Sequence, residues 1–161
     1  MVREISAGIV VFRKESGKIY YLLLHKEPHG IYKDSWDFPK GWIEKDEDDL
    51  KAALRETKEE TGIKEIKIID GFKEVINFMF KKGNELVNKT VKYFLGITEN
   101  KKVKVSFEHA GYEWLEYEDA LKRITSKGSR EVLKNANEFV KKGITFNETL
   151  NSFKKNGRKK I

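Results

Sequence analysis

The sequence predicts an α+β fold, or a mixed β-sheet covered by helices. Runs of β-branched and aromatic residues alternate with helical segments in the order strands, helix, strands, helices. No internal repeat or break in composition divides the chain, and 161 residues with 39% hydrophobic content suit one domain with a genuine core. We therefore expect a single domain over residues 1–143, followed by a basic tail or an extra helix over residues 144–161.

The first part of the chain has the pattern of a β-hairpin. Residues 5–13 and 19–26 are rich in β-branched and aromatic residues, and a short segment containing Ser16 and Gly17 separates them. Residues 27–42 contain both prolines and several turn-forming residues. We expect this segment to be a loop.

A helix is predicted over residues 46–61. Asp46 is a suitable N-cap, because its side chain can accept a hydrogen bond from a free backbone N–H. Asp48 and Asp49 favour the first turn, where the helix dipole attracts negative charge. Gly62 stands where a glycine commonly ends a helix.

The second half of the chain predicts further strands and then helices. Residues 66–80 and 86–97 are expected to be strands joined by a glycine-containing turn. Residues 111–115 form a shorter extended piece. Helices are expected over residues 118–125 and 129–142, which completes the α+β order.

Composition restricts the classes of function. The absence of cysteine excludes disulfides, thiolate metal sites and cysteine nucleophiles. The longest apolar run, residues 19–24, is far shorter than the ~18 residues of a membrane span, and we expect a cytoplasmic protein with no membrane partner. The net charge of +7 favours binding of anions such as phosphates. A surface rich in lysine and glutamate is also typical of proteins from thermophiles, to which we attribute most of the charge content.

The predicted helix 46–61 carries a cluster of carboxylates. Glu56, Glu59 and Glu60 lie at i, i+3 and i+4, and are therefore neighbours on the helix surface. Two unit charges ~4 Å apart repel by roughly 4 kcal/mol near a protein surface, so such a cluster calls for cations. Mg²⁺ prefers hard oxygen ligands of this kind. Arg55 can pair with Glu59, or reach back towards Glu47 and hold the carboxylates in place.

The side of this helix that adjoins the carboxylates is suited to packing on a sheet. The residues expected there are Leu50, Ala53, Leu54, Thr57 and Thr61, whereas Lys51 and Lys58 are expected in solvent. Taken alone, three glutamates in a lysine- and glutamate-rich chain more often form a solvated acidic face. The residues around them favour the metal site instead.

Those surrounding residues carry a resemblance to a known family. Eight positions fit the pattern G-x5-E-x7-R-E-U-x-E-E-x-G-U, where U is a bulky aliphatic residue: Gly41, Glu47, Arg55, Glu56, Glu59, Glu60, Gly62 and Ile63. This pattern resembles the signature of the Nudix hydrolases. Thr57 departs from it at the first U, a position on the packing face of the helix.

Weaker motifs extend the resemblance over residues 4–139 and favour one branch of the family. Residues 36–41, 53–57, 70–73, 89–93, 108–109 and 114–115 are similar to those of asymmetrical diadenosine tetraphosphate hydrolases. In that branch a threonine at the first U position is familiar, so Thr57 fits it. The resemblance implies a Nudix-like α/β/α sandwich, with a mixed sheet between helices and Mg²⁺ or Mn²⁺ as cofactor.

The resemblance also implies roles for the acidic residues. Glu56 and Glu60 would be metal ligands with Glu59 close by, and the backbone carbonyl near Gly41 can also ligate. Glu108 occupies the position of an acidic residue that completes the metal site or activates water, and its alternative is an exposed glutamate at a loop edge. Glu56, Glu108 and Arg55 are therefore the candidate catalytic residues.

Other residues are candidates for binding the substrate. Lys40 beside Gly41 can contact a phosphate, and Lys89 and Tyr93 share one sheet face at i and i+4, although Tyr93 is equally suited to the core. The aromatic candidates for stacking on a nucleobase are His29, Tyr32, Trp36 and Phe78, of which Trp36 and Phe78 are individually better explained as packing residues. His109 either contacts phosphate or caps a turn.

Three functions compete. The first is hydrolysis of a diphosphate linkage in a dinucleoside polyphosphate, above all diadenosine tetraphosphate to ATP and AMP. The second is removal of pyrophosphate from the 5′ end of RNA or from nucleoside triphosphates; the basic surface allows an RNA partner but does not favour one. The third is a non-catalytic nucleotide-binding module, which the intact signature disfavours. The polyphosphate length, nucleobase, preferred metal and oligomeric state, monomer or homodimer, stay open.

Overall fold

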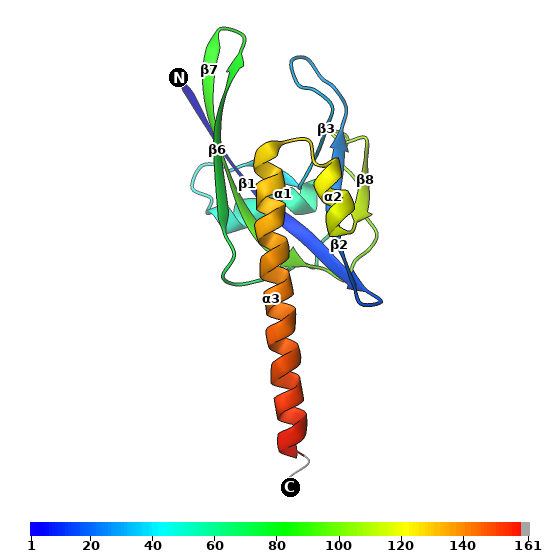
Figure 1. Ribbon diagram of the computed structural model, residues 1–161. Coiled ribbons are helices and arrows are strands. Elements are labelled where there is room, and N and C mark those ends of the chain that lie inside the picture. Colours follow the sequence, from blue (N-terminus) through cyan, green and yellow to red (C-terminus); the bar gives the residue numbers. More distant parts are fainter. Residues whose placement is uncertain (159–161) are drawn as a thin grey trace.

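The protein consists of one mixed sheet with helices on both faces (Figure 1). The computed structural model describes the backbone of residues 1–158 and the side chains of residues 1–143. The strands are β1 (Val2–Glu15), β2 (Lys18–Lys26), β3 (Ser35–Asp37), β4 (Lys40–Trp42), β5 (Lys67–Ile68), β6 (Glu74–Lys82), β7 (Glu85–Ile97) and β8 (Gly111–Leu115). The helices are α1 (Asp49–Thr61), α2 (Tyr117–Arg123) and α3 (Lys127–Arg158).

Strand β1 lies at the centre of the sheet. It pairs in parallel with β7 over eleven registered residues, from Val2 opposite Val87 to Phe12 opposite Ile97. On its other side β1 pairs antiparallel with β2 and β4. Strands β5 and β6 both pair antiparallel with β7, and β3 and β8 pair antiparallel with β2. One parallel pair among antiparallel pairs makes the sheet mixed, as predicted.

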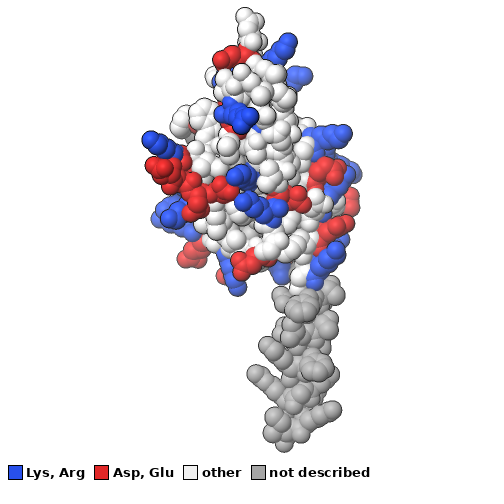
Figure 2. Space-filling view, turned by 90° about the vertical axis from the view of Figure 1, so that its left-hand side faces the viewer, with Lys and Arg blue, Asp and Glu red and all other residues white. Residues whose placement is uncertain are grey.

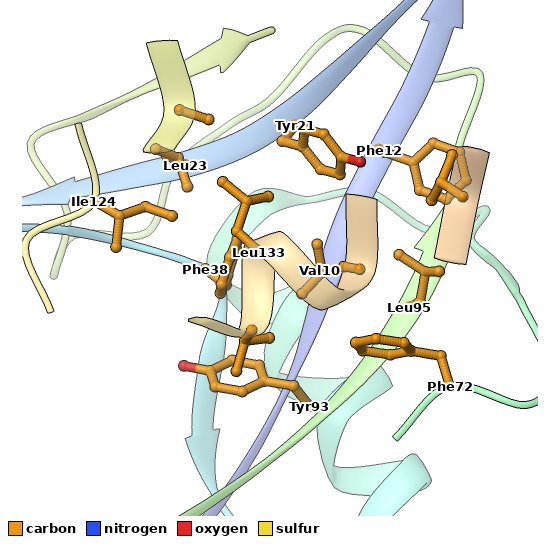
Figure 3. Close-up of a cluster of buried hydrophobic side chains, with 14 of the residues drawn as sticks. Val10, Phe12, Tyr21, Leu23, Phe38, Phe72, Tyr93, Leu95, Ile124 and Leu133 are labelled. Atoms are coloured by element: carbon orange, nitrogen blue, oxygen red, sulfur yellow. The ribbon is translucent and has the colours of Figure 1, made fainter. Parts of the chain in front are cut away.

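Alternate residues of the strands feed two separate hydrophobic cores, because successive side chains of a strand point to opposite faces. Val10, Leu23 and Tyr93 face α2 and α3 in one core, where Leu133 of α3 lies among them (Figure 3). Ile9 and Leu22 face α1 in the other core. The sheet is thus sandwiched between α1 and the α2–α3 pair, which confirms the predicted fold class.

Two predicted segments of the sheet were wrong. The single strand expected over residues 66–80 is two strands, because the chain turns between β5 and β6 at Gly71, whose φ of 92° is left-handed. The loop expected over residues 27–42 contains the short strands β3 and β4. Backbone hydrogen bonds pair β3 with β2 and β4 with β1. Neither short strand has enough residues to show a periodic pattern in the sequence.

The C-terminal helix is longer than expected. It begins at Lys127 and continues to Arg158, so the backbone of residues 144–158 is a continuation of α3. The division of the chain at residue 143 stays a prediction, and residues 159–161 lie outside the described residues. Within the described part of the chain, no helix combines the length and apolar character needed to span a bilayer.

Candidate active site

Helix α1 carries the predicted carboxylates, and both of its ends are capped. Asp48 is the N-cap, and its side chain accepts a hydrogen bond from the Lys51 N–H at 2.8 Å. The prediction of Asp46 as the cap was wrong: its φ of 63° is left-handed, whereas an N-cap needs the extended backbone that Asp48 has. At the other end Gly62, with a φ of 72°, donates its N–H to the Lys58 carbonyl, which confirms the predicted C-cap.

The buried face of α1 differs in part from the predicted one. Ala53, Thr57 and Thr61 are buried as expected, but Leu50 and Leu54 are only half-buried. Ala52 and Glu60 are buried as well. The packed face is therefore turned towards the carboxylate cluster, and Glu60 is drawn into the interior rather than left beside it. Lys51 and Lys58 are exposed, as predicted.

The glycine at the start of the signature allows β4 to approach α1 closely. A Cβ added to Gly41 would lie 2.1 Å from both Cδ and Oε2 of Glu56. No side chain can occupy that space unless the carboxylate moves. The requirement for glycine here is therefore steric, and it places the backbone of β4 directly against the Glu56 carboxylate.

Arg55 organises the carboxylates of the signature. Its Nε and Nη2 donate to the two oxygens of Glu47 at 2.7 and 2.9 Å, and its Nη1 donates to Glu56 at 2.8 Å. Nη2 also donates to the Trp42 carbonyl at 3.0 Å, and Nη1 lies 3.3 Å from Glu59. The paired contact with Arg55 lowers the pKa of Glu47 to about 2. Both predicted partners of Arg55, Glu47 and Glu59, are thus confirmed.

Replacing Arg55 by lysine should destabilise the protein although the charge is kept. An ammonium group cannot donate to Glu47 in the two-pronged geometry and reach Glu56 and the Trp42 carbonyl as well. We expect the free energy of unfolding to fall by about 1.5–3 kcal/mol, the range for a hydrogen bond to a charged group. Urea denaturation measures it, with Arg3→Lys, at an exposed position, as the matched control. Equal stability of the two variants would show that the network contributes nothing.

The carboxylate of Glu60 is buried beneath the neighbouring strand. Its Oε2 accepts a hydrogen bond from the Lys40 backbone N–H at 3.1 Å. Burial raises the pKa of Glu60 to about 8; the Lys40 hydrogen bond opposes this rise, and the charge of Glu56 adds to it. Burial also raises the pKa of Glu56. Burial makes it costly for these carboxylates to ionise alone, whereas a bound cation would favour their ionised form.

Glu108 reaches the same cluster from a separate loop. Its negative charge contributes to the raised pKa values of both Glu56 and Glu60. The loop is fixed against the end of α1, because Ser106 N–H donates to the Glu60 carbonyl at 3.2 Å. Ser106 Oγ also lies 3.2 Å from Nδ1 of His109. Glu108 is itself exposed on this loop, and its charge acts on the carboxylates of α1.

Positively charged groups lie next to the acidic cluster. Lys40 Nζ pairs with Asp37 Oδ2 at 2.7 Å. Burial would lower the pKa of Lys40, but Asp37 and Tyr93 raise it overall, so Lys40 stays charged. Burial and then the charge of Lys40 lower the pKa of Lys89, which indicates that the two predicted phosphate contacts face a common region. On the face shown in Figure 2, positive and negative side chains are interspersed.

The other predicted substrate contacts fall into different environments. Tyr93 belongs to the core, where its ring meets Phe38 edge-on at 5.4 Å, which is the alternative the sequence allowed. Trp36 is half-buried and stacks on His25 at 4.5 Å, with Arg123 over the indole at 4.7 Å.

The remaining candidates are more accessible. His29 and Tyr32 pair with each other through their backbones in an exposed loop. Phe78 is 45% exposed and stands directly opposite Lys89 on the neighbouring strand. His109 is half-buried, and burial lowers its pKa. Their roles towards a substrate stay predictions.

Two charged residues near the site were missed by the sequence reasoning. Asp37 holds Lys40 through the ion pair described above. Lys26, at the end of β2, contributes to the lowered pKa values of both His109 and Lys89. Asp37 precedes Lys40 by three residues, and such a spacing indicates no contact in a segment that is expected to be a loop. Lys26 comes near His109 because β2 pairs with β8, and His109 lies in the loop that leads into β8.

The donor set fits a hard divalent cation. Glu56, Glu59, Glu60 and Glu108 supply oxygen only, which is the chemistry that Mg²⁺ and Mn²⁺ prefer. Within residues 1–143, no three acidic or histidine side chains are gathered closely enough to hold an ion in the observed conformation. Arg55 and the Lys40 N–H satisfy Glu56 and Glu60 there. A cation would compete with these donors for the same oxygens.

Comparisons with known proteins agree with this site. The NUDIX domain profile matches residues 2–136. A mouse protein named asymmetrical bis(5′-nucleosyl)-tetraphosphatase is 33% identical over 145 residues, covering 84% of this chain and 94% of the relative. An RNA pyrophosphohydrolase of Nitratiruptor is 35% identical over 119 residues, covering 68% and 76%. The crystal structure of a C. elegans Ap4A hydrolase binary complex superposes with a TM-score of 0.74 at 33% identity, covering 85% and 97%. The chain belongs to the Nudix hydrolases, enzymes that act on nucleotides.

Proposed function

We propose that the protein hydrolyses diadenosine tetraphosphate to ATP and AMP with the aid of Mg²⁺ or Mn²⁺. One observation carries the proposal: Lys40, whose backbone N–H donates to Glu60 at 3.1 Å, joins the acidic residues Glu56, Glu60 and Glu108 to a second lysine, Lys89, on which its charge acts. An acidic platform for cations beside positive groups for phosphate oxygens suits attack of water on a polyphosphate. Nudix hydrolases generally require a divalent metal, and the named mouse and C. elegans relatives support this substrate.

Each group has a task in this reaction. Glu56 and Glu60 would hold the metal, and Glu59 and the Gly41 carbonyl are further possible ligands. The metal would lower the pKa of water and balance charge on the phosphate. Lys40 and Lys89 would bind the phosphate oxygens that gain charge as the linkage breaks. Glu108 would accept the proton of the attacking water. Arg55 fixes Glu56 and Glu47 in the orientation required.

Product analysis tests the proposal. Diadenosine tetraphosphate and Mg²⁺ are incubated with the protein, and the nucleotides are separated by chromatography. We expect equal amounts of ATP and AMP, with turnover abolished by a chelator. Two molecules of ADP, or no turnover, would contradict the proposal. A 5′-triphosphorylated RNA is assayed in parallel, and its faster hydrolysis would favour the activity named for the Nitratiruptor relative.

A further inference from the structure

One large aromatic side chain, next to Gly41 in the sequence, is mostly exposed to solvent. Trp42, the last residue of β4, is 62% exposed and immediately follows Gly41. Tryptophan is usually well buried, because its large apolar ring gains from leaving water. Its backbone is nevertheless fixed, since its carbonyl accepts from Arg55 at 3.0 Å and its strand pairs with β1. The ring is thus exposed to solvent, while the backbone that carries it is held in place.

The register of the sheet places Trp42 on a defined face. Trp42 is opposite Ser6 of β1, and directly paired residues have their side chains on the same face. Ser6 is in turn registered with Val91 of β7, a residue of the core beneath α3. Trp42 therefore lies on the α3 side of the sheet, beyond the part that this core fills.

The same face carries the lysine and the second aromatic candidate. Glu4, Lys89 and Phe78 form the adjacent row across β1, β7 and β6. From β4 to β6 there are three strand spacings, so Trp42 and Phe78 stand roughly 15 Å apart. Between them the Ser6 hydroxyl is buried without a hydrogen-bond partner, and Lys89 is half-buried. Two exposed aromatic rings thus flank a polar strip that contains a cation.

We propose that Trp42 is the platform for one nucleobase of the dinucleotide, while Phe78 lies towards the other base. This inference rests on the proposed function. The aromatic rings match the two bases by stacking, and the lysine between them matches the negative charge of the connecting phosphates. Lys40 lies two residues before Trp42 on the same strand and therefore on the same face, so this base belongs to the nucleotide whose phosphate is nearest to Lys40.

Steady-state kinetics of Trp42→Ala and Trp42→Phe with diadenosine tetraphosphate test the inference. The alanine variant should raise KM roughly tenfold, the effect of losing one stacked base. Its kcat should stay within about threefold of wild type, because stacking holds substrate and transition state alike. Phenylalanine should restore most of the affinity. Tyr112→Ala, which removes another exposed aromatic ring from β8, serves as the control and should leave KM unchanged.

The possible outcomes separate the two proposals. Absence of turnover in the wild type overturns the proposed function and this inference together. Turnover in the wild type with an unchanged KM in Trp42→Ala overturns the inference alone. If Trp42→Ala changes the molar mass in solution, measured by light scattering, and leaves KM unaffected, the ring belongs to an interface between copies of the chain, and the inference is again wrong.

Discussion

Glu60→Gln should lower kcat by about 10³-fold, at the upper end of what one electrostatic contact to a transition state contributes. Glutamine keeps the size of the side chain and can still accept the hydrogen bond of the Lys40 N–H. It cannot supply the negative charge that a divalent cation needs. Turnover of diadenosine tetraphosphate measures the effect, with Glu65→Gln at an exposed position as control. Full activity of Glu60→Gln would remove α1 from the catalytic machinery.

The same substitution should increase stability in metal-free buffer, and the effect should depend on pH. The ordinary pKa of 4.5 applies to Glu60 in the unfolded chain, and burial raises it to about 8 in the folded protein. Below pH 4.5 the carboxyl is protonated in both states and imposes no penalty. Between pH 4.5 and 8 the unfolded state gains by ionising, so folding stability falls as the pH rises, and the penalty is complete above pH 8.

Glutamine imitates the neutral form and escapes this penalty. We expect the melting temperature of Glu60→Gln to exceed that of the wild type by at least ~3 °C at pH 8.5 and to equal it at pH 4. Differential scanning calorimetry in the presence of a chelator measures both values. A lower melting temperature for the variant at pH 8.5 would show that ionised Glu60 stabilises the fold. Gain in stability with loss of activity is the expected signature of a functional buried charge.

Gly41→Ala should reduce kcat/KM by about 10²-fold, because a shift of ~1 Å in a catalytic group has an effect of that size. The added methyl group would lie 2.1 Å from the Glu56 carboxylate, so the carboxylate or strand β4 must move. Either movement also disturbs Arg55, which binds both Glu56 and the Trp42 carbonyl.

Gly111→Ala is the matched control for this substitution. Nothing lies within 4 Å of a Cβ at Gly111, and its backbone is not left-handed. We expect this variant to retain wild-type kinetics. Equal kinetics for the two alanine variants would show that the close approach of β4 to α1 has no catalytic importance.

The acidic helix was predictable because its information is local. Helical periodicity places Glu56, Glu59 and Glu60 together, and the terminal glycine ends the helix where the sequence indicates. The start of the helix was not predictable from composition, since three aspartates in four residues can each act as a cap. Asp46 is excluded as the cap by its left-handed φ, and the turn before the helix is closed by a hydrogen bond from Glu44 N–H to Glu47. Both features depend on how that turn folds.

The remainder of the site depends on tertiary contacts that no short pattern reports. The Asp37–Lys40 pair exists because β3 and β4 add to the edges of longer strands. The exposure of Trp42 follows from the length of β4 and from where the core under α3 ends. For Tyr93, the alternation of side chains along the strand correctly predicted that it shares a face with Lys89. Whether that position belongs to the core or to a substrate site depends on where the helices pack, and Tyr93 is in the core.

The carboxylates of α1 are expected to bind divalent metal. Titration of the protein with Mn²⁺, followed through the electron paramagnetic resonance signal of the free ion, measures this binding without reference to any substrate. We expect the wild type to remove at least one Mn²⁺ per chain from solution, with Mg²⁺ in competition. The double variant Glu56→Gln/Glu60→Gln should leave the ion free. Equal binding by the two proteins would contradict the claim.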